Sequence, residues 1–172
     1  YNSRVLRLRF LTGAIGLSLV LFSILSGRPF FTILVAVVAA VCALEVCRLA
    51  PGLHSRDPLL ILAVAWAVLL ALRHQFGYDF GYGLIITGPL VISLIMLLPV
   101  DGRRRTFVDW AWATAGAFYV GWLLGLWDGL YLLPSGRSLV LFAMLTTFAY
   151  DTGAFFTGRA FGRHKLAPST SA

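Results

Sequence analysis

Apolar residues along the chain gather in six long runs, separated by short connections rich in glycine, proline and charge. The runs cover residues 8–25, 30–49, 59–72, 84–98, 110–130 and 138–157. At 1.5 Å per residue, each run is long enough to cross a hydrocarbon core of about 30 Å, allowing for tilt or snorkelling ends. The connections hold residues that stop helices where their backbone can reach water. The pattern predicts six transmembrane helices.

Composition supports a membrane protein. Hydrophobic residues make up 59% of the 172 residues and charged residues 12%, whereas soluble domains average about 45–50% and about 25%. Six spans with short loops use nearly the whole length, so residues 1–172 are predicted to form a single all-α transmembrane bundle. The net charge of +7 comes from cations clustered between the apolar runs. Such clusters are typical of topology signals that face anionic lipid, and no nucleic-acid partner is expected.

The cations are distributed unevenly between the two sides that six spans define. Eleven fall on one side and three on the other. The larger set is Arg4, Arg7, Arg9, Arg48, Arg56, Arg103, Arg104, Arg105, Arg159, Arg163 and Lys165, and the smaller set is Arg28, Arg73 and Arg137. Lys and Arg favour cytoplasmic connections, so the count predicts that both termini lie in the cytoplasm.

The fifth run carries small residues at every fourth position: Ala113, Ala117, Gly121 and Gly125. Such a stripe lets a neighbouring helix approach closely, where the hydrophobic effect offers no driving force between helices in lipid. It predicts a compact bundle and no particular chemistry.

Two acids fall inside predicted spans, Glu45 and Asp151, and both are functional candidates because a carboxylate in a span is costly. Structural explanations stay open for each. Glu45 has Arg48 three residues on, and the two could pair. Asp151 has hydroxyl neighbours at Thr147, Tyr150 and Thr152, which could satisfy a buried carboxyl without any ligand. The other five acids are placed in connections or at the ends of spans.

The segment after Asp151 combines glycines with cations. Gly158 and Gly162 are four residues apart, and Arg159, Arg163 and Lys165 follow within a short stretch. An acid able to hold Mg²⁺ beside cations able to hold phosphates suits nucleotide chemistry. From these residues alone, helix packing and a topology signal are the favoured explanations of the same pattern. A phosphate-binding P-loop motif is absent, and the histidines have no zinc-binding spacing.

The same segment resembles a known family. Asp151-Thr152-Gly153-Ala154-Phe155-Phe156, Gly158-Arg159 and Phe161-Gly162-Arg163-His164-Lys165-Leu166-Ala167-Pro168 are similar to the central segment of the phosphatidate cytidylyltransferases, also called CDP-diacylglycerol synthases. The resemblance in motif covers the last twenty or so residues. Elsewhere it extends only to hydropathy and to an opening pair of helices that includes Glu45 and Arg48.

The resemblance implies an enzyme of phospholipid biosynthesis in the inner (plasma) membrane, with its active face in the cytoplasm. It would transfer a cytidylyl group from CTP to phosphatidic acid, releasing pyrophosphate, with Mg²⁺ as cofactor. Asp151 would be catalytic and a candidate metal ligand, and Glu45 would support the site from within the membrane. The residues implied to lie against substrate phosphates are Arg159, Arg163, His164, Lys165, Ser169 and Ser171.

The chain departs from the family after Pro168, where a Lys-Lys pair and an acid-rich C-terminal signature are expected but missing. The chain therefore resembles the N-terminal portion of such an enzyme, truncated before the catalytic half and expected to be inactive alone. Two other functions stay open: a membrane kinase that phosphorylates a lipid alcohol from CTP, and a non-catalytic transporter or scaffold. The resemblance leaves formation of a homodimer open.

Overall fold

The computed structural model describes residues 3–50, 52–54, 57–76, 80–98 and 106–161. In this part of the chain every regular element is helical. The elements are α1 (Ser3–Ser26), α2 (Arg28–Arg48), α3 (Pro58–Ala71), the short 3₁₀ helix η1 (Arg73–Gln75), α4 (Phe80–Ile95), α5 (Phe107–Leu132) and α6 (Gly136–Phe161). Each α-helix overlaps one predicted apolar run, so the all-α class is confirmed, with six α-helices in the described residues. That all six cross the membrane stays a prediction.

The helix ends follow from local chemistry. Gly27 separates α1 from α2 with φ +113°, a conformation that suits glycine, and Pro29 follows in the first turn of α2. Asp57 caps α3 by accepting a hydrogen bond from the backbone N–H of Leu59 at 2.8 Å. Thr106 and Asp109 form a reciprocal capping box at the start of α5.

The core lies where α2, α3 and α5 pack together. Trp66, Ala67 and Leu70 of α3 are at most 1% exposed, and Ala67 and Leu70 lie against Gly121 in the small-residue stripe of α5. A Cβ atom built on Gly121 would lie 2.8 Å from the Cα of Ala67, closer than real Cβ atoms come. The close helix approach predicted from this stripe is confirmed, and glycine at position 121 is what allows it.

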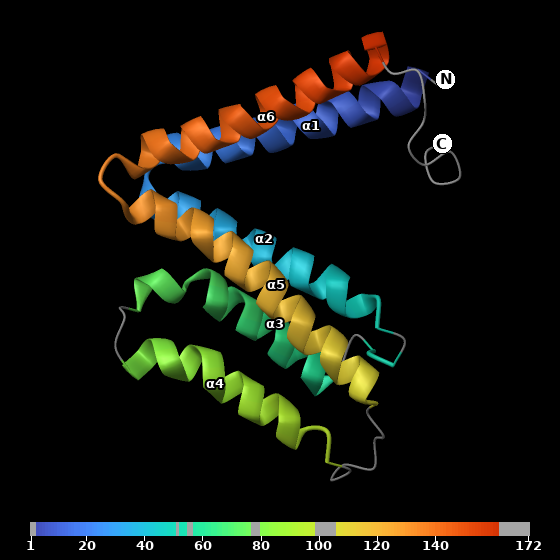
Figure 1. The fold of residues 1–172 in the computed structure, drawn as a ribbon, viewed down its shortest axis with the longest axis vertical. Coiled ribbons are helices and arrows are strands. Elements are labelled where there is room, and N and C mark those ends of the chain that lie inside the picture. Colours follow the sequence, from blue (N-terminus) through green and yellow to red (C-terminus); the bar gives the residue numbers. More distant parts are fainter. Residues whose placement is uncertain (1–2, 51, 55–56, 77–79, 99–105, 162–172) are drawn as a thin grey trace.

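The helices α1 and α6 form an arm that leaves the other α-helices (Figure 1). We call the end where α1 meets α2 and α5 meets α6 the hinge end. The opposite end, where α2 ends at Arg48 and α6 ends at Phe161, is the open end. The buried side chains described on α1 are Ser23 and Ile24, and the buried residues of α6 are Gly136 and Val140. All four lie near the hinge end, so the arm packs on the rest of the molecule only there.

Two helices in the described part, α2 and α6, are long and apolar enough to cross a membrane by length and composition. The segments Leu11–Ser26, Pro58–Ala71 and Gly83–Ile95 are apolar but shorter. Among the cations on described elements, Arg28, Arg73 and Arg137 lie at the hinge end. Arg48 and Arg159 lie at the open end, and Arg4, Arg7 and Arg9 lie in the part of α1 furthest from the hinge end. This is the grouping expected from the sequence. The fold is that of a helical membrane protein.

Candidate functional site

Asp151 lies on α6, in the stretch of the arm that is exposed on all sides. Its carboxylate receives no hydrogen bond from a described residue. The Thr147 hydroxyl donates instead to the backbone carbonyl of Ala143 at 2.9 Å, and Tyr150 is 76% exposed. The interpretation that neighbouring hydroxyls satisfy a buried Asp151 is therefore wrong, because the side chain is neither buried nor bonded to them.

Glu45 is also exposed, near the open end of α2. Arg48 lies one turn further along the same helix and is exposed too. Both side chains belong to the described part, and they form no ion pair with each other. The pairing proposed for them from their spacing is not observed, which leaves the Glu45 carboxylate accessible.

The cationic residues predicted for the site are only partly described. Arg159 is exposed in the last turn of α6, eight residues beyond Asp151. Arg163, His164, Lys165, Ser169 and Ser171 lie outside the described residues. Within the described residues, no three metal-binding side chains come together. The predicted site is thus represented by separate accessible groups at the open end.

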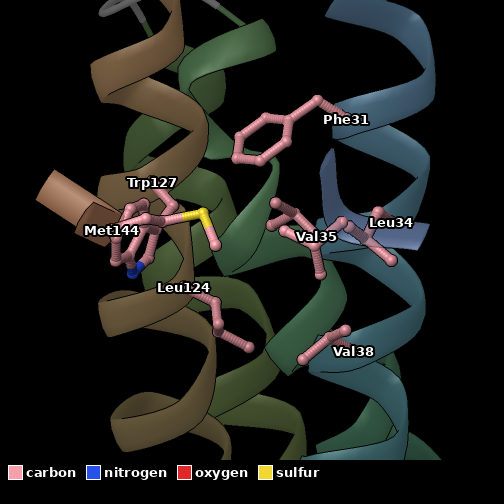
Figure 2. A pocket seen from close by; sticks show the side chains of 8 residues that line it. Phe31, Leu34, Val35, Val38, Leu124, Trp127 and Met144 are labelled. Atoms are coloured by element: carbon pink, nitrogen blue, oxygen red, sulfur yellow. The ribbon is translucent and has the colours of Figure 1, made fainter. Parts of the chain in front are cut away.

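An apolar groove lies between the arm and the rest of the molecule (Figure 2). Its volume is about 180 Å³. Figure 2 shows Phe31, Val35 and Val38 of α2 on one side, facing Leu124 and Trp127 of α5 and Met144 of α6; Leu34 of α2 and Val20 of α1 complete the lining.

The groove and the two candidate acids share helix faces. Glu45 follows Val38 by seven residues on α2, and Asp151 follows Met144 by seven residues on α6. Seven residues make two helical turns less about 20°, so each acid lies on the same face as the groove residue before it. No pattern in the sequence relates the helix faces of these two acids to one groove, because that depends on how α6 packs against its neighbours.

The structure buries a different acid, Asp128, which is fully enclosed near the hinge end of α5. Its carboxylate accepts hydrogen bonds from the Thr32 hydroxyl at 2.8 Å and the Gln75 side-chain amide at 2.7 Å. Arg28 donates to the other end of the Gln75 amide. Gln75 therefore bridges a cation and a buried carboxylate. The sequence predicts that Asp128 lies at the end of a span, and the one sequence signal for its burial is an acid within an apolar run.

Arg73 lies beside this cluster and is 1% exposed. Its guanidinium group sits 4.3 Å from the centre of the Trp122 ring. One of its terminal nitrogens donates to the backbone carbonyls of Leu70 and Trp122, at 2.9 and 3.0 Å. Burial and the charge of Arg73 lower the pKa of the adjacent His74, against a smaller opposing effect of Asp128. This shift favours the neutral form of His74.

A second buried acid, Asp109, ties the α2–α3 connection to the start of α5. It accepts hydrogen bonds from the backbone N–H of Gly52 at 2.9 Å and from the Thr106 hydroxyl at 2.7 Å. The Thr106 side-chain bond is the largest of several hydrogen bonds that lower the pKa of Asp109, while desolvation opposes them. These contacts fix the open end of the bundle, close to where α2 presents Glu45.

Comparison with known proteins assigns the chain to a family. The model of the cytidylyltransferase family matches residues 7–172. The chain is 26% identical to a phosphatidate cytidylyltransferase of Bacillus subtilis over 95% of its length, and 29% identical to one of Pseudomonas aeruginosa over 97%. A third, from Staphylococcus epidermidis, is 28% identical over 96%.

The chain spans about 62% of the length of these relatives. No solved structure matches it. The family model extends over nearly the whole chain, including both helices that carry the candidate acids. The chain belongs to the cytidylyltransferase family.

Proposed function

We propose that the protein containing this chain transfers a cytidylyl group from CTP to phosphatidic acid, giving CDP-diacylglycerol and pyrophosphate. The observation that carries the proposal is the family match over residues 7–172, together with relatives named phosphatidate cytidylyltransferase that align with 95% or more of the chain. The membrane character of the fold agrees with a lipid substrate.

The reaction joins two polyanions. A phosphate oxygen of phosphatidic acid attacks the α-phosphorus of CTP, a new P–O bond forms, and the bond from the α-phosphorus to the bridging oxygen of the β-phosphate breaks. Pyrophosphate leaves with that electron pair. In such a transfer the protein needs to form few covalent bonds with the substrates. It accelerates the reaction by neutralising the negative charge of the phosphates and by aligning the attacking oxygen with the leaving group.

The accessible carboxylate of Asp151 is suited to a metal ion. Mg²⁺ at nucleotide sites is commonly bound by one or two carboxylates together with substrate phosphates and water, so a full set of protein ligands is not required. An exposed Asp151 without a hydrogen-bonded partner among the described residues fits that role. Bound Mg²⁺ would supply charge neutralisation on the triphosphate.

The remaining candidate residues have roles that follow from their charge. Arg159, in the last turn of the described helix, would bind a phosphate at the open end. We assign Arg163, His164 and Lys165 to the same role, and the hydroxyls of Ser169 and Ser171 to hydrogen bonds with phosphate oxygens. Glu45, near the open end of α2, contributes a second accessible carboxylate.

We further propose that the six helices span the inner membrane with the open end toward the cytoplasm. The uneven distribution of Lys and Arg supports this orientation. It also brings Asp151 and Arg159 to the side where CTP is available.

The function is tested with the full-length protein reconstituted in lipid. CTP labelled on the α-phosphorus should transfer label to phosphatidic acid with release of pyrophosphate, whereas CTP labelled on the γ-phosphorus should leave the lipid unlabelled. Transfer of the γ label to a lipid alcohol would identify a kinase instead. If neither label reaches the lipid, the proposal of a nucleotide-dependent enzyme is contradicted.

A further inference from the structure

We propose that the space between the arm and α2 holds an acyl chain of the lipid substrate, and that the apolar groove receives the methyl end of that chain. The inference rests on the proposed function, since it takes phosphatidic acid as the lipid. It adds a binding site for the hydrocarbon part of the substrate, at some distance from the reacting phosphate.

The groove has the composition that an acyl chain requires. Its lining consists of aliphatic and aromatic side chains and one methionine, drawn from α1, α2, α5 and α6. Val38 is 36% exposed, which leaves its side chain open to the groove. Met144, on the arm, has a flexible thioether side chain that adapts to irregular apolar partners. Such a lining can select a hydrocarbon chain by its shape, and not by hydrogen bonds to polar groups.

Both walls become charged toward the open end. On α2 the groove face continues from Val38 to Glu45, and Arg48 follows in the last turn. On α6 it continues from Met144 to Asp151, and Arg159 follows two turns later. The space is therefore apolar near the hinge end and charged near the open end. A phospholipid has this same polarity along its length, whereas a hydrophobic helix packed here would leave both acids without polar partners.

The distance between the groove and the open end also matches the length of an acyl chain. Val38 precedes Arg48 by ten residues, or about 15 Å along α2. This is roughly half of a 30 Å hydrocarbon core. An acyl chain whose headgroup lies level with Arg48 would therefore bring its methyl end to the beginning of the groove. A much shorter chain would not reach it.

An acyl chain gains little by leaving the bilayer for an apolar groove, because lipid tails are as apolar as the groove lining. The groove should therefore discriminate by length and shape. Enlarging a lining residue should harm long chains selectively and leave short chains unaffected.

The first test compares two variants of the full-length protein. Val38→Phe fills the groove, and Val37→Phe places the same ring on a neighbouring position of α2 that is 55% exposed and does not line the groove. We expect Val38→Phe to lower kcat/KM for dipalmitoyl phosphatidic acid by about tenfold, with little change for the dioctanoyl lipid. Val37→Phe should match the wild type with both lipids. Equal losses with both lipids in Val38→Phe would overturn the proposal.

A second test does not depend on turnover. Phosphatidic acid carrying a photoreactive diazirine at the methyl end of one chain is incorporated in nanodiscs with the wild-type protein. We expect labelling of the α2 and α6 peptides that contain Val38 and Met144, above the labelling given by a phosphatidylcholine probe, and a decrease in Val38→Phe. Labelling spread equally over exposed α4 residues such as Val91 would refute the site. If the wild type labels here but transfers no cytidylyl group, the proposed function fails and the lipid site stands.

Discussion

The indole N–H of Trp66 donates a hydrogen bond of 2.8 Å to the backbone carbonyl oxygen of Ile85. In an α-helix this carbonyl would accept from the N–H of the residue four positions on, which here is Pro89 and has no N–H. The side chain of α3 thus satisfies the acceptor that proline leaves open inside α4. The helix runs without a break from Phe80 to Ile95 as a result.

This relationship predicts coupling between positions 66 and 89. Trp66→Phe keeps most of the ring but leaves the Ile85 carbonyl without a donor, and should lower the free energy of unfolding by about 1–3 kcal/mol. In a Pro89→Ala background, the backbone of the new alanine supplies the missing N–H, so the same substitution at position 66 should cost less. Unfolding of the four proteins in bicelles measures the difference. If Trp66→Phe lowers the free energy of unfolding equally in both backgrounds, Trp66 stabilises the protein through packing and not through its hydrogen bond to Ile85.

Buried Asp128 should matter for stability in a way that exposed Asp151 does not. Asp128→Ala leaves the Thr32 hydroxyl and the Gln75 amide without their acceptor, and we expect a loss of about 3 kcal/mol in the free energy of unfolding. Asp151→Ala, in a fully exposed part of α6, should change stability by less than about 0.5 kcal/mol. Thermal unfolding of both variants in the same detergent checks the contrast.

A compensating double variant tests the proposed bridge through Gln75. Asp128→Asn alone replaces one of the two acceptor oxygens used by Thr32 and Gln75 with an NH2 donor, so one of these two hydrogen bonds loses its acceptor. Adding Gln75→Glu introduces a carboxylate that can accept from the new asparagine amide and pair directly with Arg28, so the double variant should recover much of the lost stability. Thermal unfolding of the two single variants and the double variant measures the recovery. Additive losses in the double variant would contradict the bridge.

The hydrogen bond from Gly52 to Asp109 should respond to pH. Because the folded state lowers the pKa of Asp109, the ionised form adds stability above the unfolded value of about 3.9. That contribution is lost as the pH falls through the lower folded value. The amide nitrogen shift of Gly52 should therefore titrate below pH 3.9, and Asp109→Asn should abolish the titration. A midpoint above 3.9 would contradict the assigned hydrogen bonds.

Orientation in the membrane is tested by single cysteines in a cysteine-free background of the full-length protein that includes Cys42→Ala and Cys47→Ala. Ser26→Cys lies at the hinge end and Leu49→Cys at the open end, and both positions are exposed. If the open end is cytoplasmic, a membrane-impermeant maleimide should label position 26 in intact cells and position 49 only after the membrane is opened. The reverse pattern would place the proposed CTP site outside the cell.

Helix positions could be predicted from the sequence because apolar runs of sufficient length are separated by clear breakers. Pro29 and Pro58 stand at helix starts, and Gly27 stands between two helices. The close approach of α5 to α3 was also predictable, since a stripe of small residues leaves room for a neighbouring helix backbone. Such features depend on local chemistry alone.

The burial of the acids could not be predicted in the same way. The sequence predicts a span end for Asp128, yet its carboxylate is enclosed by Thr32 and Gln75, which lie 96 and 53 residues away in sequence. Asp151 lies further inside its apolar run, yet it is exposed. Position within a run indicates depth along the helix axis, whereas burial depends on which face meets a neighbour. The role of Asp151 in the candidate site remains a prediction for this reason.

That role is tested by Asp151→Asn in the full-length protein. If the carboxylate binds Mg²⁺ beside the triphosphate, loss of its charge should reduce CTP-dependent formation of CDP-diacylglycerol by roughly a hundredfold or more. The variant should also need more Mg²⁺ for half-maximal rate, which a structural role would not change. Stability should stay at the wild-type value because the side chain is exposed. Thr152→Val, on the adjacent exposed position, is the matched control and should retain activity. A wild-type rate and Mg²⁺ dependence in Asp151→Asn would remove this residue from the site.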